Sequence, residues 1–498
     1  MLLRLHDAHL IQLRFPAVEA GSFAPRPEPC QVALDAHPLI REYFAKRLRE
    51  QQPEAFREAH SRLFDHLCET TEHQPDGLDG LQPLYQAVVH GCLAGRQPEA
   101  REKVYRDRIL RGTGEDGFYS RKKLGAIGAD LGAVAAFFDH PWSRLSPNLG
   151  ADDQAWLLNE AAFYLRALGR LTEAREPMRV SGEMYVAAKN WKDAGVSFSN
   201  LSQLEVTLGL LGEGVVSARR SIEFADESGD AFQRLVNRTS AADAFHQSGA
   251  PGERREARGL FEEAERLQRE RWPEFDLLRS VQGFWYCDLI LAPAERAAWH
   301  VVLSHGEKNR GALPAGERRE MTRSGASVGA AVRLAEREEG VALTEAERRA
   351  TLALPNAERN HWLLDIALDH LTLGRVAVYR AVLEATPVSA DQNPHVPAAL
   401  DGLREAGHAD ELPKALLTAA LHQHVLGDAD AARHHLNEAQ QIAERGPMPL
   451  YLADVHLHRA RLFRDRNELA KARLLIDKHG YGRRHEELAA AEAAAMGW

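Results

Sequence analysis

The sequence predicts an all-α protein whose consecutive helical hairpins stack into a solenoid. Three observations lead to this prediction. Good helix formers such as Ala, Leu, Glu and Arg dominate the 498 residues, runs of alternating β-branched residues are almost absent, and two neighbouring stretches near the C-terminus repeat one apolar spacing. A chain of this length can form two to four ordinary domains or one extended solenoid, and the repeat favours the solenoid.

The repeated spacing lies between Leu412 and Gly480. In its first copy Gly427 closes a helix, and small or apolar residues follow at offsets of +5, +9 and +12, namely Ala432, Leu436 and Ala439. In the second copy we expect Asn467 to occupy the turn, 40 residues after Gly427, with these residues at the same offsets: Ala472, Ile476 and His479. Each copy has the pattern of one helical hairpin.

Small residues at +5 and +12 let the second helix of a hairpin lie close against the first, and the larger residue at +9 fills the gap. This pattern resembles tetratricopeptide-like repeats. One such hairpin has too little apolar surface to fold alone, at roughly 25 cal/mol per Å² buried, so neighbouring hairpins must stack.

Residues 1–52 differ from the rest and predict a partial winged-helix unit. Leu10 to Phe15 suits a strand, Pro16 to Pro29 reads as a loop, and Val32 to Leu34 suits a second short strand. Asp35 is then expected to cap a helix that has Pro38 in its first turn.

Residues 53–150 are expected to form a helical connector and the first hairpins, with loops at 73–80, 112–117 and 141–150. Residues 151–498 are expected to form the tetratricopeptide-like solenoid. Its best single unit begins at Gln154 and turns at Gly169, and the next turn, Gly209, follows 40 residues later. We expect a lengthened third turn around Gly249, a helix closed by Gly374, and a long loop or broken repeat at 305–329.

Charge and cysteine content exclude several classes of protein. The net charge of −10 gives no reason to expect a nucleic-acid partner, and acidic and basic residues are interspersed as on solvated helix faces. Four widely spaced cysteines indicate neither a disulfide framework nor a zinc site. The first residues do not form a signal peptide, and no apolar stretch is long enough to span a membrane. We expect a cytoplasmic protein.

Two short motifs suggest chemistry, and both are better explained as loops. Gly112 to Gly117 matches G-x-G-x-x-G, but its flanks are helical and its two acidic residues would repel phosphate. Gly325 to Gly329 matches G-x-S-x-G around Ser327, but the preceding residues are too charged for a buried strand. The histidines near the C-terminus lack the spacing of a metal site. We expect no cofactor and no enzymatic activity.

Counting back from each turn identifies the residues that face the concave groove of a stack of hairpins. Polar and aromatic side chains are mixed there, as suits the recognition of a peptide or ligand. The alternative is that these side chains are solvated or packed against neighbouring helices. The candidate groove residues are Trp156, Asn159, Phe163, Arg166, Ser199, Gln203, Lys414, Leu421 and His424.

The run Leu-Asp-Ala-His-Pro-Leu-Ile-Arg-Glu-Tyr-Phe at 34–44 resembles the end of the winged-helix domain in STAND-type signalling ATPases, the NACHT and NB-ARC relatives. Runs at 84–92, 283–289, 364–374 and 480–488 look like the helical sensor arms of bacterial members. In that family a winged-helix histidine contacts the β-phosphate of bound ADP. The resemblance assigns this role to His37 if an ATPase core is supplied elsewhere; otherwise His37 is a helix N-terminal residue with local partners.

No P-loop motif occurs in the chain, so the resemblance implies an ATPase module outside it. The leading hypothesis is a non-enzymatic sensor arm that binds a protein, a peptide or a small ligand through its groove and relays this to the ATPase. The alternatives are a stand-alone tetratricopeptide scaffold for protein–protein interaction and a serine hydrolase that uses Ser327.

Overall fold

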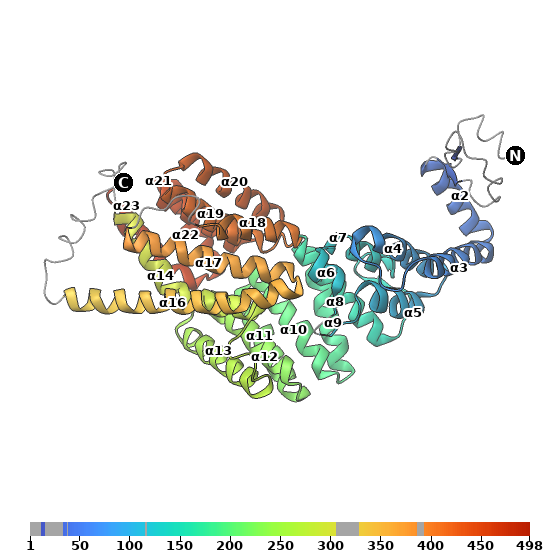
Figure 1. The fold of residues 1–498 in the computed structure, drawn as a ribbon, viewed down its shortest axis with the longest axis horizontal. Helices are drawn as coiled ribbons and strands as arrows, with labels where there is room; N and C mark the ends of the chain where they lie inside the picture. The colour runs from blue at the N-terminus through green and yellow to red at the C-terminus, as the bar shows by residue number, and fades with distance from the viewer. Residues whose placement is uncertain (1–10, 15–32, 37, 115–116, 305–327, 386–392) are drawn as a thin grey trace, which may run out of the picture.

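The computed structural model describes residues 11–14, 33–36, 38–114, 117–304, 328–385 and 393–498. These residues form an all-α solenoid of helical hairpins, as the repeated spacing predicts (Figure 1). Two antiparallel strand pairs, β1 Ile11–Arg14 with β2 Ala33–Ala36 and β3 Phe138–His140 with β4 Arg144–Leu145, are the only sheets in the described part. The predicted first strand pair is confirmed.

The helices before the main solenoid vary in length, from three residues in α5 to 18 in α3. Tyr43 and Phe44, on the first of them, are more than half exposed. The bounds of these helices are α2 Pro38–Gln51, α3 Pro53–Thr70, α4 Gly77–Leu93, α5 Gln97–Glu99, the π-helix η2 Ala100–Ile109, α6 Tyr119–Leu124 and α7 Ile127–Ala135.

The later helices pair in antiparallel hairpins. They are α8 Ala151–Ala167, α9 Leu171–Ala187, α10 Trp191–Thr207, α11 Leu211–Ser228, α12 Ala231–Ser248, α13 Pro251–Arg271, α14 Ser280–Ser304, α16 Val328–Asn360, α17 Leu363–Glu384, α18 His395–Glu405, α19 Leu412–Val425, α20 Ala429–Arg445, α21 Pro449–Phe463, α22 Arg466–His479, the 3₁₀ turn η4 Gly482–Arg484 and α23 His485–Ala495.

The predicted packing positions are buried in the hairpins. After the Gly427 turn, Ala432, Leu436 and Ala439 are inaccessible to solvent. After the Gly169 turn, the same is true of the residues at the same offsets, Ala174, Met178 and Ser181. Both glycines have positive φ, which ends one helix and lets the next one fold back.

The second C-terminal turn differs from the prediction. It is formed by Arg464, with φ 56°, and Asp465, and Asn467 lies inside α22. The Asp465 carboxylate accepts hydrogen bonds from the backbone N–H groups of Asn467 and Glu468 at 2.8 and 3.2 Å. Aspartate satisfies these free donors well, so the helix starts earlier than expected. The two turns are therefore 37 residues apart, not 40.

Three smaller predictions are also wrong. Gly374 lies in the middle of α17, where a Cβ atom would meet Val396 Cγ2 at 2.9 Å, so its role is close packing against α18. Asp35 pairs with Gln12 within β2, and α2 begins only at Pro38. The third turn is not lengthened, because only Gly249 and Ala250 separate α12 from α13.

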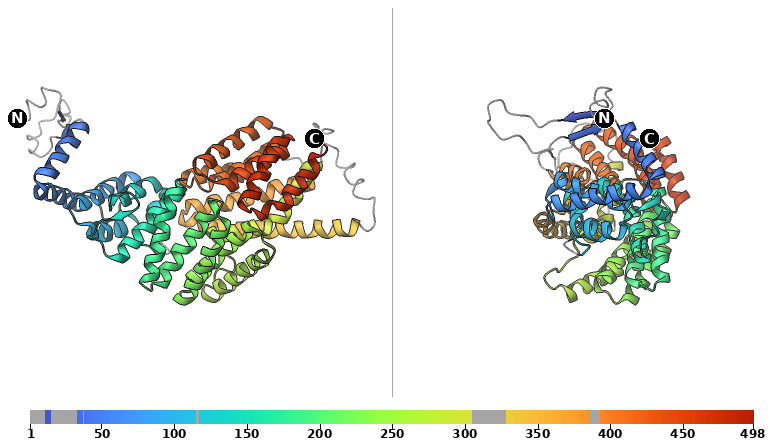
Figure 2. Two further views of the ribbon diagram at one scale, coloured as in Figure 1. Left: turned by 180° about the vertical axis from the view of Figure 1, so that it is seen from behind. Right: turned by 90° about the vertical axis from the view of Figure 1, so that its right-hand side faces the viewer.

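The solenoid closes on itself. We call α6–α13 the N-layer and α18–α23 the C-layer; α14, α16 and α17 connect them (Figure 1). The Ala409 N–H donates to Ala167 O across the layers at 2.7 Å, and His479 Nδ1 lies 3.0 Å from Gly209 O. Figure 2 shows that α2–α5 extend away from this closed part.

Glycine allows the layers to meet backbone to backbone. A Cβ atom on Gly249 would lie 2.3 Å from the Arg483 nitrogen, and one on Gly482 would lie 2.2 Å from Ser248 O. At the other end of the interface, a Cβ on Gly125 would lie 2.1 Å from Glu405 O. Any larger residue at these positions would force the layers apart.

The burial of Ile476 gives a first prediction. Ile476 is inaccessible to solvent in α22, whereas Leu474 on the same helix is 68% exposed. Ile476→Val should lower the free energy of unfolding by about 0.5–1.5 kcal/mol, because it removes one buried methyl group. Leu474→Val should change it by less than about 0.5 kcal/mol. Urea denaturation followed by circular dichroism measures both, and equal effects would contradict this packing.

Candidate functional site

A cavity of about 110 Å³ lies between the two layers. It is lined by α8, α10, α12, α14, α17, α19 and α21, together with residues 481–484. A cavity of roughly 10–15 Å³ is already large enough to hold one water molecule. This cavity is several times larger, so it has room for several waters or a small molecule.

The hairpin register explains which side chains reach the cavity. The first helix of each hairpin faces inward, and one position on it recurs six residues before the turn glycine. Gln203 precedes Gly209 by six residues, and Asp243 precedes Gly249 by the same distance. Both side chains line the cavity. Stacking of equivalent helices therefore gathers equivalent positions around one space.

One end of the cavity is a buried network of ion pairs. Arg375, on α17, donates to Asp288 Oδ1 at 2.7 Å and to Glu295 Oε2 at 3.5 Å. Arg483 also binds both carboxylates, meeting Glu295 Oε2 at 3.2 Å. All four side chains are less than a tenth exposed.

Arg484 joins three elements at the same end. Its guanidinium meets Asp454 Oδ1 of α21 at 2.7 Å, Glu295 Oε1 of α14 at 3.0 Å and Glu487 Oε1 of α23 at 2.6 Å. Arg461 completes the group by binding Glu487 Oε2 at 2.8 Å. This network links the C-layer to α14 at the closed end of the solenoid.

Burial and pairing act against each other on these groups. Burial would raise the pKa of Glu295, but Arg484, Arg483 and Arg375 hold that pKa below its usual range. Asp288 behaves in the same way, since Arg483 and Arg375 outweigh its burial and lower its pKa well below the ordinary value. The pKa of Asp454 is raised, because burial exceeds the effect of Arg484. The network thus contains one carboxylate whose charge is only partly compensated.

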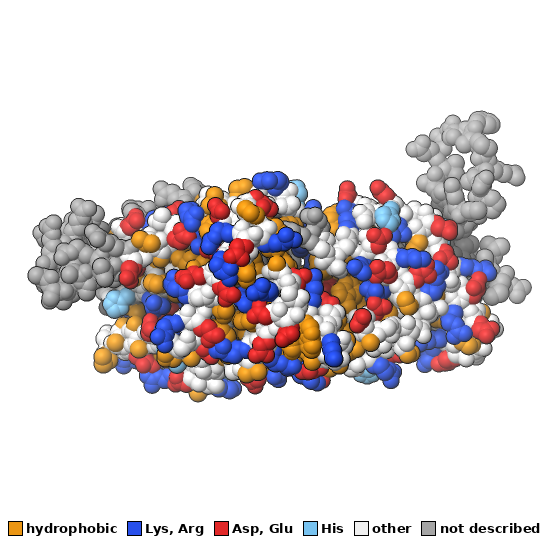
Figure 3. Space-filling view, turned by 90° about the horizontal axis from the view of Figure 1, so that it is seen from below, with side chains coloured by type: hydrophobic (Ala, Val, Ile, Leu, Met, Phe, Trp, Pro, Cys, Tyr) orange, Lys and Arg blue, Asp and Glu red, His pale blue; other side chains and the backbone are white. Residues whose placement is uncertain are grey.

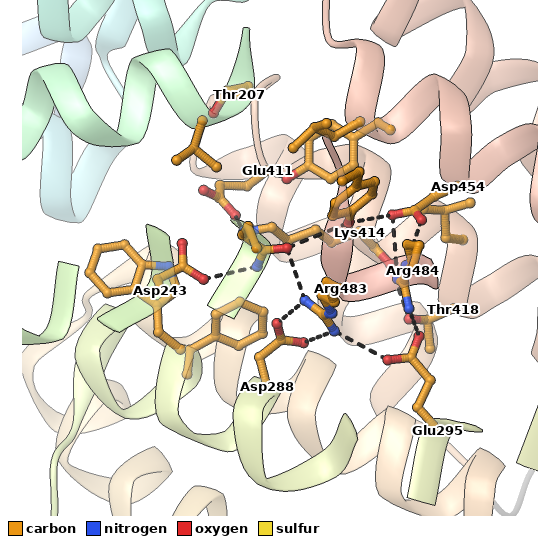
Figure 4. A pocket seen from close by; sticks show the side chains of 18 of the residues that line it. Thr207, Asp243, Asp288, Glu295, Glu411, Lys414, Thr418, Asp454, Arg483 and Arg484 are labelled. Atoms are coloured by element: carbon orange, nitrogen blue, oxygen red, sulfur yellow. Dashed lines mark hydrogen bonds and ion pairs between the residues drawn. The ribbon is translucent and has the colours of Figure 1, made fainter. Parts of the chain in front are cut away.

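The opposite side of the cavity carries Asp243, Glu411 and Lys414 (Figure 4). Lys414 Nζ pairs with Glu411 Oε2 at 2.6 Å. The Gln247 amide donates to Asp243 Oδ1 at 3.0 Å. Burial raises the pKa of Asp243 to about 6, and nearby Lys414 opposes this shift. Figure 4 shows Asp243 and Glu411 on one side, and Asp454, Arg484 and Glu295 on the other, with Arg483 between them.

Four of the candidate groove residues line the cavity: Arg166, Gln203, Lys414 and Leu421. Arg166 Nε donates to Asp410 Oδ2 at 3.0 Å across the layers, and its Nη1 donates to Gln203 Oε1 at 2.9 Å. The C-layer therefore covers the inner helix face that the sequence predicts to be an open groove.

The other five candidate groove residues do not line the cavity. They lie within helix contacts, because the closed shape and the neighbouring helices cover most of that face. Asn159 accepts from Asn200 at 3.2 Å, Arg121 lies 4.3 Å from the Phe163 ring, and Arg101 lies 5.5 Å from the Trp156 ring. Ser199 is 3% exposed, and the His424 ring is 6.4 Å from that of Phe463.

The remaining candidates give no site. His37 and Ser327 lie outside the described residues. Within the described ranges no group of three or more His, Cys, Asp or Glu side chains is placed to hold a metal ion. Gly112 and Gly117 belong to a segment between η2 and α6, as the loop interpretation predicts. In the same part of the chain, no helix has both the length and the apolar character needed to cross a bilayer.

The sequence pattern did not predict a role for Asp243 or for the ion-pair network. Asp243 could have been found, because it occupies the register of Gln203 in the following hairpin. Arg483 and Arg484 follow α22 and give no local signal. They reach the cavity only because the C-layer folds over the N-layer.

No protein-family model matches the chain, and no curated protein matches it at a significant level.

Proposed function

We propose that this chain is a non-enzymatic sensor arm of a STAND-type signalling ATPase and that its solenoid recognises a small ligand in the cavity between its layers. The observation that carries the proposal is the convergence of side chains from seven inner helices and residues 481–484 on one space. Such convergence on a concave, partly apolar pocket is typical of ligand sites. The resemblance of residues 34–44 to a winged-helix end supplies the link to an ATPase.

The size of the cavity favours a small ligand over a folded protein or a peptide. At about 110 Å³ the space accommodates a few water molecules or one small molecule. A helix or extended peptide needs a continuous open groove, and the C-layer covers that surface here. A small molecule that contacts both layers would stabilise their closed arrangement.

Signalling then follows as a shift between two states. A ligand that binds the closed layers more tightly than separated ones favours closure by its difference in affinity. A change from about 1% to 99% closed requires roughly 5.5 kcal/mol of differential binding. The ATPase would read out this shift through the helices α2–α5 that extend from the closed part (Figure 2).

The test combines the chain with any P-loop ATPase whose gene adjoins its own. Association should be measured by analytical ultracentrifugation, and nucleotide turnover should be measured with and without the chain. Binding together with a change in turnover supports the proposal. No association and unchanged turnover would reject the ATPase link.

A stand-alone tetratricopeptide scaffold is the second candidate. The side chains of Tyr43 and Phe44 on α2 are more than half exposed. Exposed aromatic rings are common anchors at protein interfaces, so they favour the scaffold. Capture of partners unrelated to any ATPase, lost in the double variant Tyr43→Ser/Phe44→Ser, would favour the scaffold over the sensor.

A further inference from the structure

The charges that line the cavity do not balance in pairs. Every lining cation of the described chain has a carboxylate partner: Arg166 with Asp410, Arg375 with Asp288, Lys414 with Glu411, Arg483 with Glu295, and Arg484 with Asp454. Four of the five lining carboxylates are in these pairs. Asp243 is the fifth, and no ion pair of the described residues joins it to a cation.

Asp243 is therefore a half-buried carboxylate that faces the cavity and has one neutral partner. Gln247 occupies one of its oxygens, and the other oxygen has no hydrogen-bond donor among the described residues. Lys414 lies close enough to lower the pKa of Asp243, but its ammonium is held by Glu411 at 2.6 Å. A carboxylate in such a setting is stabilised most by a cation that enters the cavity.

The walls near this carboxylate also suit a cation. Phe284 and Trp285 of α14 line the same cavity, and the Lys414 ammonium already lies 5.1 Å from the Phe284 ring centroid. Aromatic faces attract cations through their negative quadrupole, more strongly where water is excluded. An anionic ligand, in contrast, would have to break an existing ion pair to reach a free cation.

We infer that the cavity binds a small organic amine, with Asp243 as the counter-ion of its ammonium group. This inference rests on the proposed function, since it names the class of ligand that the sensor would detect. The residues that hold the amine are Asp243 and Gln247 on α12 and the aromatic wall of α14.

Binding should depend on pH in a defined direction. The titratable and charged groups that face Asp243 are Asp288 on α14, Lys414 on α19, Tyr451 on α21 and Arg483 after α22. The amine binds the ionised carboxylate, and the pKa of the free Asp243 carboxyl is about 6. Affinity should therefore be constant above pH 7 and fall about tenfold for each pH unit below 6.

The experiment measures thermal stabilisation of the full chain by a fixed panel of probes. The amines are ethanolamine, choline, putrescine, agmatine and lysine. Ethylene glycol and 1,4-butanediol are the neutral counterparts, and succinate and phosphate are the anions. Isothermal titration at pH 5 and pH 7.5 gives the affinity of each compound that stabilises. The inference predicts stabilisation by at least one amine and by none of the neutral counterparts.

The variants are Asp243→Asn, which removes the charge at constant shape, Asp243→Glu, which keeps it, and the exposed control Asp430→Asn. Amine affinity should fall at least tenfold in Asp243→Asn, should be retained in part in Asp243→Glu, and should not change in Asp430→Asn. The pH profile of the unaltered protein gives the same answer if Asp243→Asn fails to fold. Stabilisation by anions or neutral compounds alone would overturn the amine inference while leaving the small-ligand sensor intact. The inference is also overturned if no amine stabilises the chain, or if amine binding survives in Asp243→Asn.

Discussion

Arg484→Met is expected to lower the free energy of unfolding by about 3–5 kcal/mol, because it removes one partner of a buried ion-pair network. Arg484 is 5% exposed and joins Asp454, Glu295 and Glu487. Without it, Glu295 keeps Arg483 and Arg375, whereas Asp454 keeps only the hydroxyl of Tyr481 at 3.2 Å. The penalty therefore falls mainly on a buried, uncompensated Asp454.

The stability lost in Arg484→Met should depend on pH, because Asp454 is left buried without its cation. In Arg484→Met the folded protein should protonate Asp454 at a higher pH than the unfolded chain does, so the loss of stability should shrink as the pH falls from 8 to 5. The double variant Arg484→Met/Asp454→Asn should recover part of the loss at pH 8, as measured by urea denaturation in a double-mutant cycle.

The matched control is Arg219→Met. Arg219 pairs with Glu256 at 2.6 Å, but both side chains are at least 40% exposed. Its removal should cost less than about 1 kcal/mol. Figure 3 shows acidic and basic side chains intermingled over one such outer face. If both arginine variants lost equal stability, the buried network would not hold the layers together.

Gly249→Ala is expected to separate the two layers. Gly249 has φ +65°, and a Cβ atom there would lie 2.3 Å from the Arg483 nitrogen and 2.4 Å from the Gly482 carbonyl carbon. Backbone atoms cannot rotate away as a side chain can. The variant should lose about 1–3 kcal/mol beyond the strain of its positive φ, and the radius of gyration from small-angle X-ray scattering should increase.

Gly229 provides the control for backbone strain. Its φ is +67°, at the same position after a helix, but a Cβ atom there would have no atom of the rest of the chain within 4 Å, apart from its immediate neighbours in sequence. Gly229→Ala should cost about 1–2 kcal/mol and leave the scattering unchanged. An unaltered radius of gyration in Gly249→Ala would contradict the layer contact at Gly482.

Local patterns predicted the fold well and the site only in part. The offsets after Gly427 and Gly169 depend on contacts between neighbouring helices, so they can be read from the sequence. The position of the turn at Arg464 was missed because Asn467 suits a turn, while the decisive capping group is the carboxylate of Asp465.

The site depends on contacts between distant parts of the chain. Arg166 meets Asp410 across 244 residues, and Arg483 meets Asp288 across 195 residues. Repeat spacing places these side chains on the inner face, but it contains no information on how tightly the solenoid curves. That curvature is set by close glycine contacts such as Gly249 with Gly482, whose partners the sequence does not reveal.

The exchange of the Ala409 amide hydrogen tests the closed solenoid most directly. This N–H belongs to the segment between α18 and α19 and donates to Ala167 O of α8 at 2.7 Å. Mass-resolved hydrogen exchange of a peptide covering residues 406–412 should show one amide as slow as those within α19, and slower still with a bound amine. Exchange within seconds, at the rate of an exposed loop, would show that the layers are apart in solution and would contradict a ligand site between them.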